Sequence, residues 1–203
     1  MFCLIGKSGS GKDMLADILE GRGYHRIRAY TTRPRRDGED ENAYSWVSET
    51  MFIDQMAHEE FLETCSYETA YGKWYYGTPW PTVGKTNDKY FYILSPAGYE
   101  KAVKNLPDDI SLKCIYVDSN NRTILKRLKK RNNNQDEKKQ EEILRRFEAD
   151  KKDFMKAYDF SDLVICNVDG TDPENLADQI EDFLRTGRKQ VRGIYPHDGY
   201  PHD

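Results

Sequence analysis

Short apolar runs alternate with amphipathic stretches along most of the chain. Residues 2–5 are apolar throughout, which is typical of a strand buried on both faces of a parallel sheet. The same pattern predicts further strands at 27–30, 90–94, 112–117 and 163–166. Because helical segments separate these strands, we expect an α/β fold with a parallel sheet and helices on both of its faces.

Apolar residues spaced three or four positions apart predict the helices. The predicted helices with clear limits are 12–20, 48–63, 98–104 and 173–185. Two more are predicted from the apolar stripes Ile124, Leu125 and Leu128, and Ile143, Leu144, Phe147, Phe154 and Met155. Residues 31–42 are too polar for a core and predict a loop, whereas 67–76 predict short strands and turns.

The composition of the 203-residue chain fits one α/β domain, or a core domain with a small insert. Aromatic residues make up 12%, which can supply a core, so global disorder is excluded. No apolar run approaches the roughly 18 residues that cross a bilayer, and residues 1–5 lack the features of a signal peptide. With four widely spaced cysteines, we expect a cytoplasmic protein with free thiols and no membrane contact.

Charge is distributed unevenly along the chain. The formal net charge is -4, yet residues 122–156 contain thirteen basic and seven acidic side chains. A confined basic segment in an acidic protein suits a small polyanion better than a nucleic acid. The aromatic residues of this segment lie at helical core spacing, so we expect no nucleic-acid partner.

Residues 6–13, Gly-Lys-Ser-Gly-Ser-Gly-Lys-Asp, match a phosphate-binding loop as far as the lysine. The motif follows a predicted buried strand and opens a predicted helix, where its N–H groups and the helix dipole can bind a phosphate. We expect Lys12 to reach the β- and γ-phosphates of a nucleotide. The expected phosphate-binding residues are Gly6, Lys7, Ser8, Gly9, Ser10, Gly11, Lys12 and Asp13.

Asp13 departs from the motif, which normally has Ser or Thr there to bind Mg²⁺ through a hydroxyl. A carboxylate is itself a good ligand for a hard metal ion. We therefore expect Asp13 to contact Mg²⁺ directly or through water.

A second set of motifs follows the phosphate-binding loop. Residues 30–39, Tyr-Thr-Thr-Arg-Pro-Arg-Arg-Asp-Gly-Glu, and 44–48, Tyr-Ser-Trp-Val-Ser, resemble the signature of the guanylate kinase family. Residues 75–79, Tyr-Tyr-Gly-Thr-Pro, resemble its tyrosine pair. Arginines within 127–131 and 145–147 are similar to its lid arginines, and 162–167 is similar to its strand ending in Asn near adenine. The motifs occur in the family's order and the resemblance covers residues 1–186.

The resemblance implies a three-layer P-loop kinase fold. Its core would be 1–31 and 89–186, with an inserted acceptor-binding subdomain at about 32–88 and a helical lid at about 129–146. Residues 187–203, where the apolar pattern stops and Tyr-Pro-His-Asp occurs twice, are expected to be a flexible tail. A metal site built from the His-Asp pairs of the tail is a weaker alternative.

The resemblance also implies roles for individual residues. The expected ligands of the acceptor phosphate are Arg33, Arg36, Tyr44 and Tyr76, in keeping with bidentate binding of phosphate by guanidinium groups. The alignment of Arg35 against Arg33 and Arg36 is open by one position. The expected base-reading residues are Glu68, Thr78 and Ser95, with Glu63 as the alternative to Glu68. The expected catalytic residues are Lys12, Arg127, Arg131 and Arg146, and Asn167 is expected to bind ATP.

Two positions depart from the family. Ala29 stands in place of a serine, and Ile93-Leu94-Ser95 stands in place of Asp-Ile-Asp, whose carboxylates read guanine and support the metal. The resemblance implies an ATP- and Mg²⁺-dependent kinase for GMP or dGMP. Two alternatives are a kinase for another nucleoside monophosphate and a non-catalytic interaction module. The intact loop with Lys12 favours the enzyme.

Overall fold

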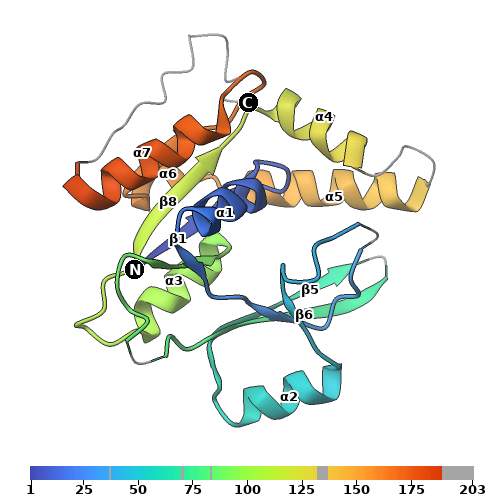
Figure 1. Cartoon of the computed structure of the whole chain (residues 1–203). Coiled ribbons are helices and arrows are strands. Elements are labelled where there is room, and N and C mark those ends of the chain that lie inside the picture. Colours follow the sequence, from blue (N-terminus) through green and yellow to red (C-terminus); the bar gives the residue numbers. More distant parts are fainter. Residues whose placement is uncertain (37, 70, 83, 132–136, 189–203) are drawn as a thin grey trace.

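The computed structural model describes residues 1–36, 38–69, 71–82, 84–131 and 137–188. Their strands form a five-stranded parallel sheet and a four-stranded sheet beside it (Figure 1). The α/β fold with a parallel sheet as its core, expected from the apolar runs, is confirmed. Of the predicted tail, residues 189–203 lie outside the described residues.

The parallel sheet contains four of the five predicted strands. Its order is β2 (His25–Arg26), β7 (Tyr90–Ile93), β1 (Phe2–Ile5), β8 (Lys113–Asp118) and β9 (Leu163–Cys166). Phe2 pairs with Phe91 on one side and with Lys113 on the other, and every neighbouring pair is parallel. The prediction of one strand at 27–30 is wrong, because the chain leaves this sheet after Arg26 and enters the second sheet at Tyr30.

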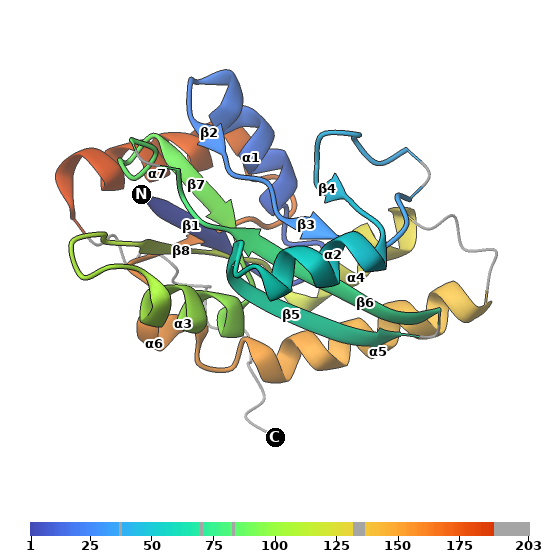
Figure 2. The ribbon, with the colours of Figure 1, turned by 90° about the horizontal axis from the view of Figure 1, so that it is seen from below.

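Helices cover both faces of the parallel sheet (Figure 2). Successive residues of β1 point to opposite faces. Phe2 and Leu4 pack with α1 (Lys12–Gly21) and α7 (Pro173–Thr186). Cys3 and Ile5 pack in the core that includes residues of α3 (Pro96–Asn105) and α6 (Ala157–Phe160). This two-sided burial explains why the strand sequence is apolar at every position.

The helices α4 (Asn121–Arg131) and α5 (Glu137–Asp153), which contain the segment predicted as a lid at about 129–146, share a small core of their own. Its buried residues are Ile124, Leu128, Ile143 and Phe147, as their spacing predicts. Leu144 and Met155, which the pattern also placed on the apolar stripe, are 53% and 73% exposed, so that part of the prediction is wrong. A side chain one position from the buried stripe turns outward on a helix packed on one side only.

The second sheet has the order β4 (Ser45–Trp46), β3 (Tyr30–Thr31), β6 (Gly72–Pro79) and β5 (Phe61–Thr69), with α2 (Glu49–Ala57) packed on it. Its strands β5 and β6 form a long antiparallel hairpin. The helix predicted at 48–63 is shorter, since β5 begins at Phe61. The Ser48 hydroxyl caps α2 by accepting a hydrogen bond from Met51 N at 3.2 Å.

The base of the β5–β6 hairpin is attached to the parallel sheet. Asn105 of α3 donates to Leu62 O at 2.7 Å, and the Tyr92 hydroxyl of β7 donates to Pro79 O at 3.1 Å. These bonds fix the hairpin base near the end of β7. The loop after β1 lies at the same edge of the sheet, because the carboxyl ends of parallel strands meet there.

A substitution at Gly77 tests the packing of this hairpin. A Cβ on Gly77 would lie 2.8 Å from the Phe61 ring, inside the closest contact that real Cβ atoms make. We expect Gly77→Ala to cost about 1–3 kcal/mol by overpacking. For a chain of this size each kcal/mol lowers Tm by roughly 2–4 °C. Gly21→Ala is the control, since nothing lies within 4 Å of a Cβ there. Equal Tm values for the two variants in calorimetry would contradict the packing.

Candidate active site

The loop between β1 and α1 has the backbone of an anion-binding site. Gly9 and Gly11 adopt φ angles of 83° and 97°, in the left-handed region that favours glycine. A side chain on Gly11 would also strike the Asn167 amide. The loop therefore needs glycine at these positions, and its curvature turns successive N–H groups toward one point.

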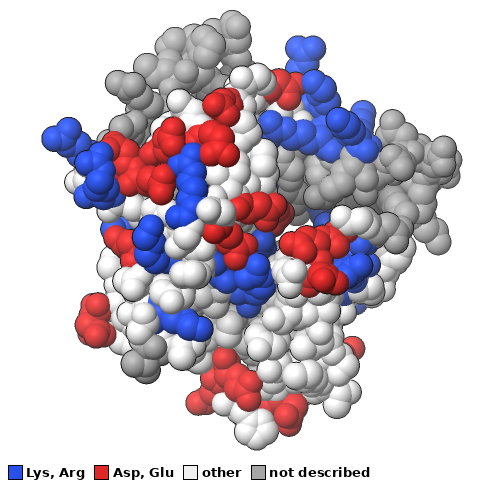
Figure 3. Space-filling model, viewed as in Figure 1, with Lys and Arg blue, Asp and Glu red and all other residues white. Residues whose placement is uncertain are grey.

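Asn167 and Arg127 hold this loop from behind. The buried Asn167 amide donates to Ser10 O at 2.8 Å. Arg127 of α4 donates to Asn167 Oδ1 at 3.1 Å and to Asn167 O at 3.3 Å. The structure thus brings these two predicted site residues to the loop, where they support its backbone. Figure 3 shows other Lys and Arg side chains gathered over α4 on the same face of the molecule.

Lys12 folds back over the loop. Its ammonium group donates to Gly6 O at 2.5 Å and to Lys7 O at 3.0 Å. Both acceptors are neutral carbonyls, whereas a phosphate would add the attraction between opposite charges to its hydrogen bonds with Lys12. A phosphate in the loop is therefore a better partner for Lys12 than these carbonyls.

A carboxylate from the lid helix α5 reaches the same loop. Ser8 N donates to Asp150 Oδ2 at 2.6 Å. This is a charge-assisted hydrogen bond, and it uses an N–H that the loop would otherwise offer to a phosphate oxygen. The sequence analysis missed Asp150, because an acidic residue in a basic helix has no local signal for a contact 142 residues away.

The predicted ligands of the acceptor phosphate gather on the second sheet. Arg33, which is 3% exposed, donates to the two carboxylate oxygens of Glu39 at 2.9 and 2.6 Å. The Arg36 N–H donates to Glu39 as well, at 3.0 Å. The Arg33 guanidinium carbon lies 5.4 Å from the centroid of the Tyr44 ring, which in turn lies 6.1 Å from the ring of Tyr76. We call Arg33, Arg36, Tyr44 and Tyr76 the phosphate cage.

Charges in the phosphate cage are balanced by Glu39, which the sequence analysis did not identify. Although burial raises the pKa of Glu39, its bonds to Arg33 and Arg36 hold the pKa below the usual value. Burial raises the pKa of Tyr44 to about 12. At neutral pH the cage therefore contains two guanidinium groups, a carboxylate and a neutral Tyr44 hydroxyl.

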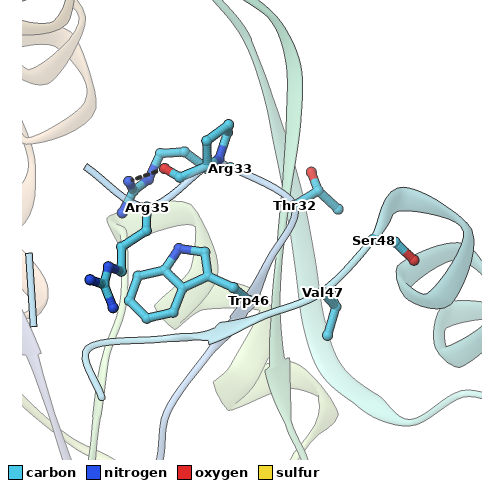
Figure 4. A pocket seen from close by; sticks show the side chains of 7 residues that line it. Thr32, Arg33, Arg35, Trp46, Val47 and Ser48 are labelled. Carbon is cyan, nitrogen blue, oxygen red and sulfur yellow. Dashed lines mark hydrogen bonds between the residues drawn. The ribbon is translucent and has the colours of Figure 1, made fainter. Parts of the chain in front are cut away.

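Arg35 lies outside the phosphate cage. Figure 4 shows it extended beside the Trp46 ring, in a hollow lined by Thr32, Arg33, Pro34, Arg35, Trp46, Val47 and Ser48. Its guanidinium is half exposed and lies 3.8 Å from Glu41. Arg35 thus has an exposed partner in Glu41, whereas Arg33 is buried against Glu39 and Tyr44.

Glu68, which was expected to read the base, does not lie beside Thr78. Glu68 pairs with Lys73 toward the tip of the hairpin, and its side chain is 78% exposed. Glu63 lies opposite Thr78, whose hydroxyl donates to Glu63 Oε1 at 2.5 Å. The position of a β5 residue relative to the tyrosine pair of β6 depends on how many residues form the turn between the two strands. Spacing along the sequence does not show that number.

Glu63 is a buried carboxylate with one oxygen unused. The residue is 7% exposed, and among the described residues Oε2 has no hydrogen-bond partner. Burial raises the pKa of Glu63, although Thr78 and Lys101 lower it. An acceptor of this kind fits a ligand that brings N–H donors, because a buried polar atom without a partner costs about 1–3 kcal/mol.

Ser95 lies beside this carboxylate. Both Ser95 Oγ and Glu63 Oε2 are within 3.3 Å of a Cβ built on Gly98. Ser95 caps α3 by accepting a hydrogen bond from Gly98 N at 3.0 Å. The structure therefore brings together Glu63, Thr78 and Ser95 and excludes Glu68 from the group.

The lid helix α5 also contacts the hairpin. The Arg146 guanidinium carbon lies 5.9 Å from the Trp74 ring of β6, within the range of a cation–π interaction. Arg131 ends α4, and its side chain lies outside the described residues, so its role stays a prediction.

Asp13 is the only predicted metal ligand that the structure describes. Its side chain is 68% exposed and lies 3.4 Å from Arg26 Nη2. Among the described residues there is no group of three His, Cys, Asp or Glu side chains arranged for a metal ion. The His-Asp pairs of the tail lie outside those residues. No helix in the described part of the chain is long and apolar enough to span a membrane.

Comparison with known proteins gives matches over nearly the whole chain. A family model described as guanylate kinase matches residues 1–186. A curated guanylate kinase of Methylobacillus flagellatus is 34% identical over 86 residues, which span 41% of this chain and 41% of the relative's length. The crystal structure of guanylate kinase from Anaplasma phagocytophilum superposes with a TM-score of 0.64 and 19% identity, covering 94% of this chain and 87% of that one.

The contact of Asp150 with the loop predicts an unusual effect. Asp150→Asn removes the charge that competes with a phosphate at Ser8 N, so we expect a Kd for ATP or inorganic tripolyphosphate about 3- to 10-fold lower in calorimetry, the scale of a charge-assisted against a neutral hydrogen bond. Glu148→Gln on the same helix is the control, because Glu148 pairs with Lys151 at 2.8 Å. Unchanged or weaker binding, or an equal gain in the control, would contradict competition at the loop.

Proposed function

The chain belongs to the guanylate kinase family, and from this we propose that it transfers the γ-phosphoryl group of ATP to GMP or dGMP. The observation that carries the proposal is the closeness of two sites for anions. Asp13, next to Lys12 of the loop, lies 3.4 Å from Arg26, whose guanidinium carbon is 5.9 Å from the Tyr44 ring of the phosphate cage. Two phosphates bound in these sites would be neighbours, as direct phosphoryl transfer requires.

The residues of the two sites would act mainly by position and charge. Lys12 leaves the carbonyls of its loop and binds the β- and γ-phosphates, while the loop N–H groups hold the rest of the donor. Arg33 and Arg36 grip the acceptor phosphate. Arg127 and Arg146 bring further positive charge from the lid. Such fixed charges stabilise the negative charge on the transferring group at little cost of reorganisation.

Mg²⁺ would enter with ATP, and the residues present fit it. Mg²⁺ in nucleotide sites takes one or two carboxylates together with phosphate oxygens. The exposed Asp13 carboxylate at the start of α1 supplies such a hard oxygen beside the loop. Held there, Mg²⁺ would supply positive charge that neutralises part of the charge of the nucleotide phosphates.

Glu63 would read the base. Guanine presents N1–H and an amino group as donors along one edge, and the two carboxylate oxygens can accept both. The hydroxyl of Thr78 has one proton, which goes to Glu63 in this structure. Thr78 therefore positions the carboxylate of Glu63. The donors of guanine would form the hydrogen bonds that its second oxygen, Oε2, lacks.

Two other readings have weaker support. A non-catalytic interaction module does not require a phosphate-binding loop, whereas this chain has one with two left-handed glycines and an intact Lys12. A kinase for another nucleoside monophosphate is compatible with Ser95 in place of a carboxylate. Adenine lacks a proton at N1, however, so it would leave Oε2 of the buried Glu63 without a donor.

A coupled ADP-release assay with ATP, Mg²⁺ and a panel of ribo- and deoxyribonucleoside monophosphates tests the proposed function. We expect GMP or dGMP to be the best acceptor. Lys12→Ala should lower kcat more than about a hundredfold, the scale of losing one preorganised charge at the reacting group. No turnover with any acceptor would overturn the kinase, and near-normal turnover of the variant would remove Lys12 from the mechanism.

The base-reading role of Glu63 has a separate test. Glu63→Gln replaces an acceptor oxygen with an NH₂ donor that opposes a donor of guanine. We expect KM for GMP to rise roughly ten- to a hundredfold, since a hydrogen bond to a charged group contributes about 1.5–3 kcal/mol. Glu68→Gln makes the same chemical change on the exposed part of the hairpin and should leave KM unchanged. If the effects of the two variants are reversed, the base site has been assigned to the wrong end of β5.

A further inference from the structure

Arg26 is a buried cation that no sequence motif singles out. It ends β2, the short edge strand of the parallel sheet, and its side chain is 5% exposed. The guanidinium lies between the two sites for anions, 3.4 Å from the Asp13 carboxylate and 5.9 Å from the Tyr44 ring centroid. Its position joins the donor loop to the phosphate cage.

The partners of Arg26 do not use its hydrogen-bonding capacity. A guanidinium has five N–H donors. Within the part of the chain that the structure describes, the side chain of Arg26 has one ion pair, with Asp13, and no hydrogen bond. Asp13 itself is 68% exposed, so water competes for its carboxylate. Since a buried charge is costly unless it is paired and hydrogen-bonded, these donors fit an anionic ligand.

Arg33 adds a second reason for an anion at this place. Its guanidinium carbon lies 5.4 Å from the same Tyr44 ring, so two cations flank one aromatic side chain. Arg26 and Arg33 both lower the pKa of Tyr44, whereas Asp13 and Tyr76 raise it, which places all of these charges within range of one hydroxyl. An anion near this hydroxyl would therefore be attracted by both guanidinium groups.

We propose that Arg26 is a ligand of the acceptor phosphate, binding it on the side that faces the donor loop, and that Asp13 takes the place of that phosphate at Arg26 when the acceptor is absent. The proposal rests on the proposed function for the identity of the acceptor. It adds a third arginine to Arg33 and Arg36.

The pair also explains how the loop tolerates Asp13. A carboxylate in place of a hydroxyl adds a negative charge beside a site built for phosphates, and it would repel them. Arg26 compensates that charge while it is paired with Asp13. The alternative is that Arg26 serves Asp13 alone and never touches a phosphate.

The two possible roles of Arg26, as a ligand of the acceptor phosphate or as a partner of Asp13 alone, predict different contributions of the phosphate group to the affinity for the acceptor. The measured quantity is the ratio of the Kd of guanosine to the Kd of GMP, determined by calorimetry without ATP. For Arg26→Gln we expect this ratio to fall about ten- to a hundredfold, with the Kd of guanosine unchanged, because the charge-assisted contact to phosphate is lost. For Asp13→Asn we expect the ratio to rise severalfold, because Arg26 loses its competing partner and the phosphate loses a repelling charge.

Arg28→Gln is the matched control. Arg28 lies two residues further along the same segment and pairs with Glu20 at 3.0 Å, so its ratio should equal that of the wild type. If the glutamine variant does not fold, Arg26→Lys gives the same test. It keeps the charge, so we expect a smaller fall in the ratio of the two Kd values.

Three results would overturn the proposal: an unchanged ratio in both Arg26 variants, shifts of Arg26→Gln and Asp13→Asn in the same direction, or no nucleoside monophosphate in the acceptor panel binding more tightly than its nucleoside. A lower ratio in Arg26→Gln from a wild type that transfers no phosphoryl group would overturn the kinase while supporting Arg26 as a phosphate ligand.

Discussion

Groups that bind phosphate need a partner even when no phosphate is present, and this need organises the candidate active site. Glu39 accepts from Arg33 in the phosphate cage, Asp150 accepts from Ser8 N in the loop, and Asp13 pairs with Arg26 between them. Under the proposed function, each of these carboxylates occupies the position that a phosphate oxygen would take. Each substrate would then have to displace an internal anion as it binds.

The path of the chain explains why these contacts meet. The parallel sheet carries the donor loop, and the second sheet carries the phosphate cage and the base site. Only residues 27–29 separate β2 of the first sheet from β3 of the second. Arg26 is the last residue of β2 before the chain crosses from the first sheet to the second. A side chain at this position extends from the parallel sheet to both Asp13 and Tyr44.

Sequence reasoning recovered what local pattern determines and lost what depends on long-range pairing. The buried strands and the glycine loop follow from periodicity and from backbone conformation, and the cage residues Arg33, Tyr44 and Tyr76 follow from the family motifs. The sequence pointed to Glu68 ahead of Glu63 because the register of a hairpin depends on cross-strand pairing, and residue spacing alone does not define that pairing. Asp150, Glu39 and Arg26 were missed because tertiary contacts, rather than any motif, place them at the site.

The β5–β6 hairpin connects the Glu63–Thr78 pair with the helix α5. Its base contains Glu63 and Thr78, and its distal half contains Trp74, which touches Arg146 of α5. Trp74 lies four positions before Thr78 in the extended strand, a length of about 13 Å. A small rotation at the base of this ribbon would become a larger displacement near α5. Under the proposed function, binding of the acceptor's base at Glu63 would therefore be coupled mechanically to the position of Arg146.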